Sequence, residues 1–257
     1  MREGLIAIFF IFLVFFNCRA ETIAFLVENS PYYFQKDLLV KKGDSLSAEP
    51  GVVIELAKDV SIIIEGRVNI AGYPRGGEVI FKAVGPSQNY NKGFWKGLII
   101  KSKEKNVIQY AVIQHSKIGI ELVDDSSVNI TGNIITQNKT GIKAAGVKGL
   151  SITQNNFLGN FIDIEITDSA GLIERNYFEG SLIALNLKEG YPQIQKNSFK
   201  QVHKNLVECY NAKDLLAGEN FWGSAEEEKI KEWILQSGKG KFIFKPFLKE
   251  PPDLWKR

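Results

Sequence analysis

The sequence predicts an all-β fold in which short strands stack into a solenoid of about eight coils. A small pattern recurs six times along the 257-residue chain, at intervals of 21 to 23 residues. Each unit has an aliphatic residue, once alanine, three positions before its centre and a large apolar residue two positions after it. Apolar positions at this spacing, in a repeat this short, are typical of stacked β-coils. The six centres are Tyr110, Asn133, Asn155, Asn176, Asn197 and Asn220.

Residues 1–20 have the pattern of a cleaved secretory signal peptide. The run from Gly4 to Phe16 is almost wholly apolar, and Cys18 and Ala20 are small residues placed before the expected cut. Its thirteen residues are fewer than the roughly 20 that span a bilayer, which favours cleavage over a membrane anchor. We therefore expect an exported protein, periplasmic or extracellular, with no transmembrane span in the mature chain. Lipidation at Cys18 is left open as an alternative.

The mature chain is nearly neutral. Removing Arg2, Arg19 and Glu3 leaves 30 of the 32 basic and 28 of the 29 acidic residues, a net charge of +2. This balance, with scattered lysines, disfavours a nucleic-acid partner and a charged membrane surface. Cys209 is the one cysteine that remains, so no intramolecular disulfide is expected, and a buried position is the common one for such a residue.

Residues 21–44 are expected to form an N-terminal cap, with strands at 22–27 and 38–40 that cover the end of the solenoid. The coils are expected over residues 45–223. The first of them correspond to apolar segments that precede the asparagine units, and Asn220-Phe221-Trp222-Gly223 closes the series. These early segments are residues 49–54, 63–68, 78–81 and 94–99.

In this order and with this period, the chain resembles the right-handed parallel β-helix repeat proteins of the pectin-lyase-like superfamily. The resemblance covers roughly residues 45–223, about eight coils of 22 residues, and points to no single member. It implies a single-stranded, right-handed parallel β-helix. It also implies a scaffold shared by lyases, hydrolases, epimerases, adhesins and accessory proteins, so the fold alone does not fix the function.

The repeated asparagines are expected to be structural. Asparagine tolerates the unusual backbone angles of a tight turn, and stacked amides can hydrogen-bond along a column at the ~4.7 Å strand repeat. The predicted asparagine ladder is Asn133, Asn155, Asn176, Asn197 and Asn220. The flanking apolar columns are expected to be buried; they are Val107, Ile130, Ile152, Ile173, Ile194 and Ala217, and Val112, Ile135, Phe157, Phe178, Phe199 and Trp222.

A second strand is expected about nine residues after each asparagine. Its inward column reads Ile120, Ile142, Ile164, Leu185 and Leu206, and its outward column reads Glu121, Lys143, Glu165, Asn186 and Val207. The neighbouring column, also read as outward, offers Asp163. Acids that alternate with a lysine are typical of a solvated sheet face.

Residues 224–257 are expected to cap the last coil with a short helix and a tail. Ser224 to Glu227 reads as a helix capping box, followed by Ile230, Trp233 and Ile234 on one face.

Two function classes follow for the outward columns. A calcium-dependent lyase needs several carboxylates on adjacent coils and an arginine or lysine as base, but no aligned column stacks three carboxylates. A polysaccharide lyase, epimerase or hydrolase that uses Lys143, Asp163, Glu165 and Arg175 is therefore the alternative. Asp124 and Asp125, the paired aspartates, are expected to form a turn between coils.

The preferred prediction is a non-catalytic protein with a polar face that binds carbohydrate or another component of the cell envelope. Its candidate ligand residues are Tyr90, in the polar loop 85–93, with Lys143, Asp163 and Glu165. No cofactor or metal is expected, because the mature chain has no methionine, two histidines and one cysteine. A scaffold that binds a protein partner is the third hypothesis. The three hypotheses predict different surfaces. If the protein is an enzyme, acidic side chains should converge at one place. If it binds sugar, exposed aromatic residues should form a row, and if it is a scaffold, an apolar strip should lie on the surface.

Overall fold

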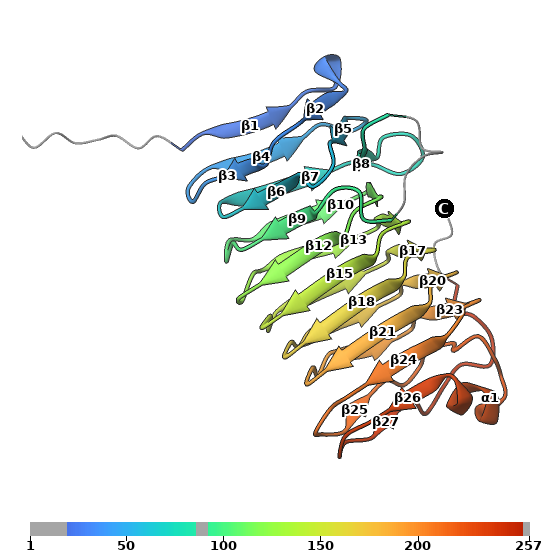
Figure 1. The fold of residues 1–257 in the computed structure, drawn as a ribbon. Coiled ribbons are helices and arrows are strands. Elements are labelled where there is room, and N and C mark those ends of the chain that lie inside the picture. Colours follow the sequence, from blue (N-terminus) through green and yellow to red (C-terminus); the bar gives the residue numbers. More distant parts are fainter. Residues whose placement is uncertain (1–19, 86–91, 254–257) are drawn as a thin grey trace, which may run out of the picture.

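The structure is a computed structural model that describes residues 20–85 and 92–253. It is a parallel β-solenoid in which each coil adds one strand to each of three sheets (Figure 1). Strands from successive coils pair in parallel, so that Ile108 lies beside Ile130 and Ile130 beside Ile152. The predicted fold class is confirmed.

We name the three sheets A, B and C in the order in which the chain enters them. Sheet A consists of β1 (Thr22–Phe25), β4 (Ser45–Ala48), β7 (Arg67–Ala71), β10 (Asn106–Gln109), β13 (Val128–Thr131), β16 (Leu150–Thr153), β19 (Gly171–Glu174) and β22 (Gln193–Gln195). Sheet B consists of β2 (Tyr32–Phe34), β5 (Val53–Leu56), β8 (Val79–Ala83), β11 (Ala111–Gln114), β14 (Ile134–Thr136), β17 (Asn156–Leu158), β20 (Tyr177–Glu179) and β23 (Ser198–Lys200). Sheet C consists of β3 (Leu38–Val40), β6 (Ser61–Ile64), β9 (Gly97–Ile100), β12 (Ile118–Val123), β15 (Thr140–Ala145), β18 (Ile162–Thr167), β21 (Ile183–Lys188), β24 (Asn205–Cys209) and β26 (Ile234–Gln236).

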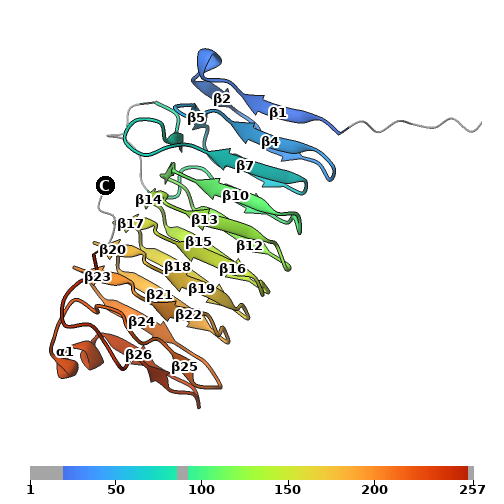
Figure 2. The same ribbon diagram turned by 180° about the vertical axis from the view of Figure 1, so that it is seen from behind.

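The other elements lie near the two ends of the solenoid. They are the 3-10 helix η1 (Val27–Asn29), the two-stranded pair β25 (Leu215–Leu216) and β27 (Phe242–Ile243), and the helix α1 (Glu227–Glu232). Figure 1 views the molecule from the side of sheet C and Figure 2 from the side of sheet A. The three outer faces of the sheets are therefore separate surfaces.

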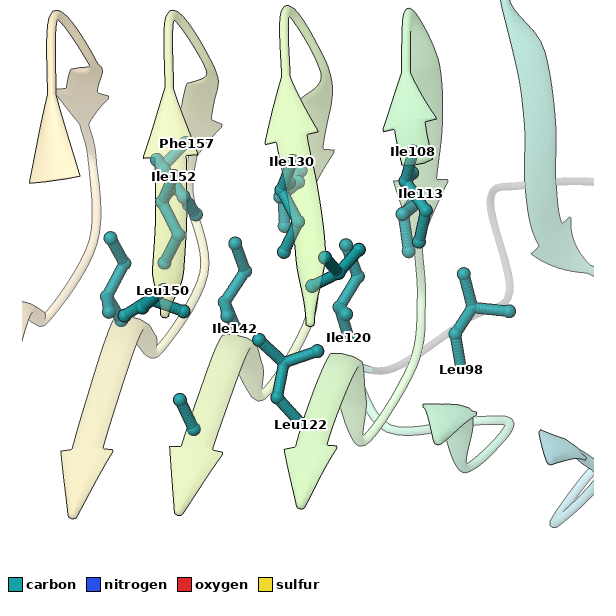
Figure 3. Packing of buried hydrophobic residues seen from close by; sticks show 14 of the residues in the cluster. Leu98, Ile108, Ile113, Ile120, Leu122, Ile130, Ile142, Leu150, Ile152 and Phe157 are labelled. Atoms are coloured by element: carbon teal, nitrogen blue, oxygen red, sulfur yellow. The ribbon is translucent and has the colours of Figure 1, made fainter. Parts of the chain in front are cut away.

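The core is a set of side-chain columns that continue from coil to coil, and Figure 3 shows a part of it. Aromatic rings stack through its later coils: the centroids of Phe157 and Phe178 are 4.9 Å apart, those of Phe178 and Phe199 4.6 Å, and those of Phe199 and Trp222 4.6 Å. Full burial of an aliphatic or aromatic side chain contributes about 1.5–3 kcal/mol. Since each coil adds several such residues, the repeated apolar columns are the main source of stability.

The first asparagine unit is shifted by one residue from the prediction. Tyr110 is not its centre: Ala111 takes that place, and its N–H donates to Asn133 Oδ1 at 2.8 Å. The sequence does not separate these alternatives, because neighbouring residues on both sides are apolar. The buried residues of this unit are Ile108 and Ile113, and the predicted Val107 and Val112 face outward.

A second one-residue error falls in the last unit of the predicted second strand. Val207, not Leu206, pairs with Leu185 in the inward column. Glu208 therefore replaces Val207 in the outward column, beside Asn186.

The asparagines do form an amide ladder, at the corner between sheets A and B. Asn176 Oδ1 accepts the N–H and the Nδ2 of Asn155 at 3.0 and 3.1 Å. Its own Nδ2 donates to the Ile152 carbonyl at 2.9 Å and to Asn197 Oδ1 at 3.1 Å. The expected backbone reason is wrong, because the residue with positive φ is the one before the asparagine, such as Arg175 at 54°. Asparagine is needed because one side chain both donates and accepts.

At the N-terminal end, the expected cap strands are part of the solenoid. β1, β2 and β3 pair in parallel with β4, β5 and β6, and so form a first coil. Three aromatic rings of this coil lie at the N-terminal end of the core. The centroid of the Phe25 ring lies 4.6 Å from that of Tyr32 and 5.7 Å from that of Phe34.

At the C-terminal end, α1, β26 and the tail cover the last coil (Figures 1 and 2). Ile230 of α1 is buried, and Trp222 packs edge-on against Phe242 with ring centroids 5.7 Å apart. The expected capping box does not form. The helix begins after Glu226, whose side chain makes no cap hydrogen bond, and Ser224 Oγ accepts the Glu226 N–H rather than that of Glu227.

Candidate functional site

The outer face of sheet C carries the predicted charge ladder. Lys143 lies between Glu121 and Glu165 in adjacent strands, and its Nζ is 4.0 Å from Glu165 Oε1. Further along the column, Glu208 accepts hydrogen bonds from Asn205 Nδ2 at 2.8 Å and Lys204 Nζ at 3.2 Å. The column is thus a series of mutually compensating charges, which is the behaviour of a solvated sheet face.

Asp163 does not face solvent beside Lys143, as the alternation of its strand predicts. It is fully buried at the corner between sheets B and C, where both Asp163 and Ile164 turn inward. Asn160 Nδ2 donates to Asp163 Oδ1 at 2.9 Å. Asp163 Oδ2 and the nearby Ser181 Oγ make no hydrogen bond of good geometry with any described group.

Burial raises the pKa of the Asp163 carboxyl to about 7, although Asn160, Ser181 and the positive charge of Lys92 act to lower it. Lys92 Nζ lies 4.4 Å from the centroid of the Phe161 ring, just outside the corner. Burial also lowers the pKa of Lys92, against the opposite effect of Asp163. These groups form a compact cluster, but the carboxyl inside it is closed off from a large ligand.

Sequence reasoning missed a second amide ladder, to which this cluster belongs. Asn138 Oδ1 accepts the N–H and the hydroxyl of Ser116 at 2.9 and 2.7 Å, and Asn160 Oδ1 accepts the N–H of Asn138 at 2.9 Å. In the next coil Ser181 stands where an asparagine would continue the ladder, and Asn160 donates to Asp163 instead. The 22-residue spacing of Asn138 and Asn160 was the available signal, but two members do not make a visible repeat.

The remaining predicted site residues are Arg175 and Tyr90, and Arg175 is not found beside Asp163. Arg175 is exposed at the corner between sheets A and B, whereas Lys143 and Glu165 lie on sheet C. Tyr90 lies outside the described residues. Of the four proposed catalytic side chains, only Lys143 and Glu165 are in contact, and they neutralise each other.

Asp124 and Asp125 form a turn at the end of β12, as expected, with φ values of 51° and 55°. Cys209 is buried, as predicted for a lone cysteine. Among the described residues, no group of three or more histidine, cysteine, aspartate and glutamate side chains is placed to hold a metal ion.

Sheet A presents a different outer face, on which most side chains are polar and uncharged; Arg67 of β7 is exposed there, and Val107 and Leu172 are apolar members. Thr153 Oγ1 donates to Thr131 Oγ1 at 3.1 Å, and Ser151 Oγ donates to Asn129 Oδ1 at 3.3 Å. In the two aligned columns only Glu174 is charged, and Lys196 neutralises it. The columns are Ser47, Asn69, Val107, Asn129, Ser151, Leu172 and Gln193, and Gln109, Thr131, Thr153, Glu174 and Gln195.

The outer face of sheet B contains an apolar row over four adjacent strands. The row consists of Val53, Ile80, Val112 and Ile134, all half-buried. A parallel column on the same face carries ion pairs, with Lys82 Nζ 3.1 Å from Glu55 Oε1 and Lys200 Nζ 3.1 Å from Glu179 Oε1.

The strongly exposed aromatic side chains do not form a row. Tyr33 lies on β2, Tyr73 between β7 and β8, Phe161 at the corner between sheets B and C, and Tyr191 between β21 and β22. The row of exposed aromatic residues expected of a sugar binder is therefore absent from the described residues, and a sugar on this surface would be held by hydrogen bonds rather than by stacking on rings in line.

An open groove of about 560 Å³ lies where the chain leaves sheet C for sheet A, after β3, β6 and β9. Both signs of charge line it, so its acids do not converge on one point. Its lining residues are Lys42, Glu65, Lys101, Ser102, Lys103 and Glu104.

Comparison with known proteins gives one match. A family profile described as "Right handed beta helix region" matches residues 88–221, which is 134 of the 257 residues. No curated protein and no solved structure matches the chain. Within the described ranges, no helix is long and apolar enough to cross a bilayer.

Proposed function

Because the chain belongs to the right-handed β-helix family, a scaffold that carries many different sites, we propose its function from its surfaces. It is an exported, non-catalytic protein whose sheet A binds a neutral polysaccharide or a similar uncharged polar component of the cell envelope. Export rests on the signal-peptide pattern of residues 1–20, with a periplasmic or extracellular location.

The observation that carries the proposal is the largely uncharged polar face of sheet A from β10 to β22. Its side chains offer hydroxyl and amide groups, which both donate and accept hydrogen bonds, as the hydroxyls of a sugar do. Successive strands repeat these groups every ~4.7 Å along the solenoid, so a polymer laid along the axis meets equivalent partners at each coil. An anionic polymer would instead favour a row of lysines or arginines, which these columns lack.

The geometry of the predicted catalytic residues supports a non-catalytic role. A general base needs hydrogen-bond reach to its substrate, but the Asp163 carboxyl is enclosed, and the Lys143 ammonium lies beside Glu165. Arg175 is at a different corner, so it cannot act with them on one bond.

The proposal is tested with a neutral glucan and with polygalacturonate, each in insoluble form, with and without calcium. We expect retention on the neutral glucan without release of fragments. Thr153→Glu places a charge on sheet A and should weaken retention by about tenfold or more. The matched control is Thr136→Glu on the outer face of sheet B, which also removes one threonine hydrogen bond and should retain the wild-type affinity.

Two outcomes would contradict this function. Chain cleavage that Glu165→Gln abolishes would establish a polysaccharide lyase, epimerase or hydrolase on sheet C. Equal weakening by Thr136→Glu and Thr153→Glu would show that sheet A is not the binding face.

A second candidate is favoured by the apolar row on sheet B. An exposed apolar strip is typical of a protein interface, which fits an accessory or scaffold protein with a protein partner. Absence of retention on both polysaccharides would turn the assignment to this face, and Ile134→Lys is then expected to abolish partner binding.

A further inference from the structure

The N-terminal end of the solenoid is an open sheet edge. β1, β2 and β3 are the terminal strands of sheets A, B and C, and each pairs on one side only within the described residues. At the opposite end, α1 and the tail pack against the last coil, where the Leu248 N–H donates to the Asn220 carbonyl, but β26 and β27 are also terminal strands that pair on one side only within the described residues. At the N-terminal end, by contrast, the terminal strands of all three sheets belong to one coil.

The backbone groups on the open side can be assigned from the pairing. Ser45 N–H donates to the Glu21 carbonyl and Glu49 N–H to the Phe25 carbonyl, so these residues point toward β4. Because successive backbone groups of a strand point to opposite sides, Thr22 and Ala24 direct theirs toward the open edge. By the same reasoning, Phe34 points toward β5 through its bond from Ala57, and Tyr33 points outward.

The three edge strands lack the features that normally prevent association. Their sequences are TIAF, YYF and LLV, with no charged residue and no proline. Exposed apolar side chains gather around them, since Val27 is 49% exposed, Tyr33 50% and Leu39 44%. Of the nearby acids, Asp37 is turned toward the second coil, where its Oδ1 accepts the Ser61 N–H at 2.8 Å, and Asp44 of the second coil accepts the Glu21 N–H at 2.9 Å. Glu21 and Glu28, which flank β1, are exposed.

We infer that two copies of the protein associate through this end, with β1 of one copy paired antiparallel to β1 of the other. A twofold axis through the middle of β1 produces this pairing in sheet A, and it places β2 of one copy against β3 of the other. A charged edge would repel its copy, but β1 carries no charge. The inference rests on the proposed export: every described strand lies between Thr22 and Ile243, so removal of residues 1–20 would keep all of them.

The test is the mass of the chain from Glu21 onward in solution, by light scattering and sedimentation from about 1 to about 100 µM. We expect a concentration-dependent dimer. Ala24→Pro removes the outward N–H of β1 without touching the bonds of Glu21 and Phe25 to β4, and Leu39→Lys adds a charge at the edge of sheet C. Each variant should weaken dimerisation by about tenfold or more. The matched control, Leu216→Lys, alters an exposed leucine at the other end and should leave the dimer unchanged.

Hydrogen exchange gives a second readout that does not depend on substitution. In the wild type at high concentration, the Ala24 and Tyr33 amides should exchange more slowly than in dilute solution. A monomer at about 100 µM, a dimer that survives both edge variants, or protection confined to another face would each overturn the inference. If Ala24→Pro does not fold, Leu39→Lys and the exchange data decide.

Discussion

Asp163 stands in a column that its neighbouring coils fill with small residues. Gly141 occupies the same position in β15 and Ala184 in β21, the strands on either side. Because both side chains are small, little space separates the coils at the corner between sheets B and C. A carboxyl placed there is buried, and in return it accepts the amide hydrogen of Asn160 at the end of the second ladder. The residue thus completes a hydrogen-bond series, but its ionised form is poorly stabilised.

This burial predicts a pH-dependent stability. The pKa of Asp163 is about 7 in the folded protein and 3.8 in the reference state, so between these values the folded state holds a proton that the unfolded chain has released. The free energy of unfolding should therefore fall as pH rises from 4 to 7, by on the order of 4 kcal/mol. Asp163→Asn keeps an acceptor for Asn160 and removes the charge. Thermal unfolding should show no gain for it at pH 4 and a higher Tm at pH 8.

The control for this prediction is Asp168→Asn, which alters an exposed acid just after the same strand. Its Tm should follow the wild-type dependence on pH. A Tm difference between Asp163→Asn and wild type that does not grow with pH would show that the carboxyl is not the cause.

Sequence alternation could not reveal the buried position of Asp163. In Ile162, Asp163, Ile164 and Glu165 a strict period of two places Asp163 outside. The chain bends at the corner, and Asp163 and Ile164 both turn inward, which breaks the period for one residue. The asparagines show the reverse case: their positions were predictable from the repeat, but their use as two-way hydrogen-bonding groups rather than as turn residues was not.

At the scale of single strands, close contact between coils fixes some positions to glycine. A Cβ on Gly141, in β15, would lie 2.6 Å from the Asp163 carbonyl oxygen and 3.2 Å from Phe157 Cδ1. The carbonyl belongs to the next strand of sheet C and cannot move without breaking the ladder.

Gly141→Ala should therefore destabilise the protein by about 3 kcal/mol, through overpacking and a displaced strand. Gly149→Ala is the matched control, because a Cβ there meets nothing within 4 Å. Urea unfolding should separate the two variants, with Gly149→Ala within about 0.5 kcal/mol of wild type. Equal stability of both alanine variants would mean that the coils have more freedom than their contacts indicate.

Strand positions followed from the repeat period, but strand register did not follow everywhere. The errors at Tyr110 and Leu206 fall where two adjacent residues are both apolar, so that a slip of one position still looks buried. The C-terminal helix was predicted from an apolar face, of which only Ile230 lies in α1 and is buried; Trp233 ends the helix and Ile234 begins β26. Its start was not, because Ser224 makes a local turn with Glu226 rather than a helix cap.

For the whole molecule, the C-terminal cap determines whether the last coil is protected. Trp222 is fully buried beneath Phe242, and β26 covers the edge of β24. Without these elements, both the large ring and the strand edge would face water.

Removal of residues 224–257 should destabilise the solenoid by on the order of 5 kcal/mol and make it aggregate, because apolar area and an unpaired edge are exposed together. The control is removal of residues 249–257, which leaves α1, β26, β27 and Leu248 in place. Thermal scans with light scattering should distinguish them. Equal Tm and solubility of the two truncated chains would show that the cap contributes little.

The repeat was sufficient to predict the fold, because each unit states the same burial pattern and errors in one unit do not alter the others. The site was less accessible. Lys143 and Glu165 were correctly placed together on sheet C, but the neutral face of sheet A depends on which residues of three sheets share a surface, and that information lies in the coil geometry.

The near-constant spacing of the amide ladders also bears on how the chain folds. Asn133 and Asn155 are 22 residues apart, and Asn155 and Asn176 21, so each new coil closes a loop of nearly the same length onto the previous one. Loop closure then costs nearly the same at every step, and each step is rewarded at once by a new rung of hydrogen bonds and a new layer of core. Once two coils have formed a nucleus, growth should proceed as a zipper in either direction, at a rate set by one coil rather than by the length of the whole chain.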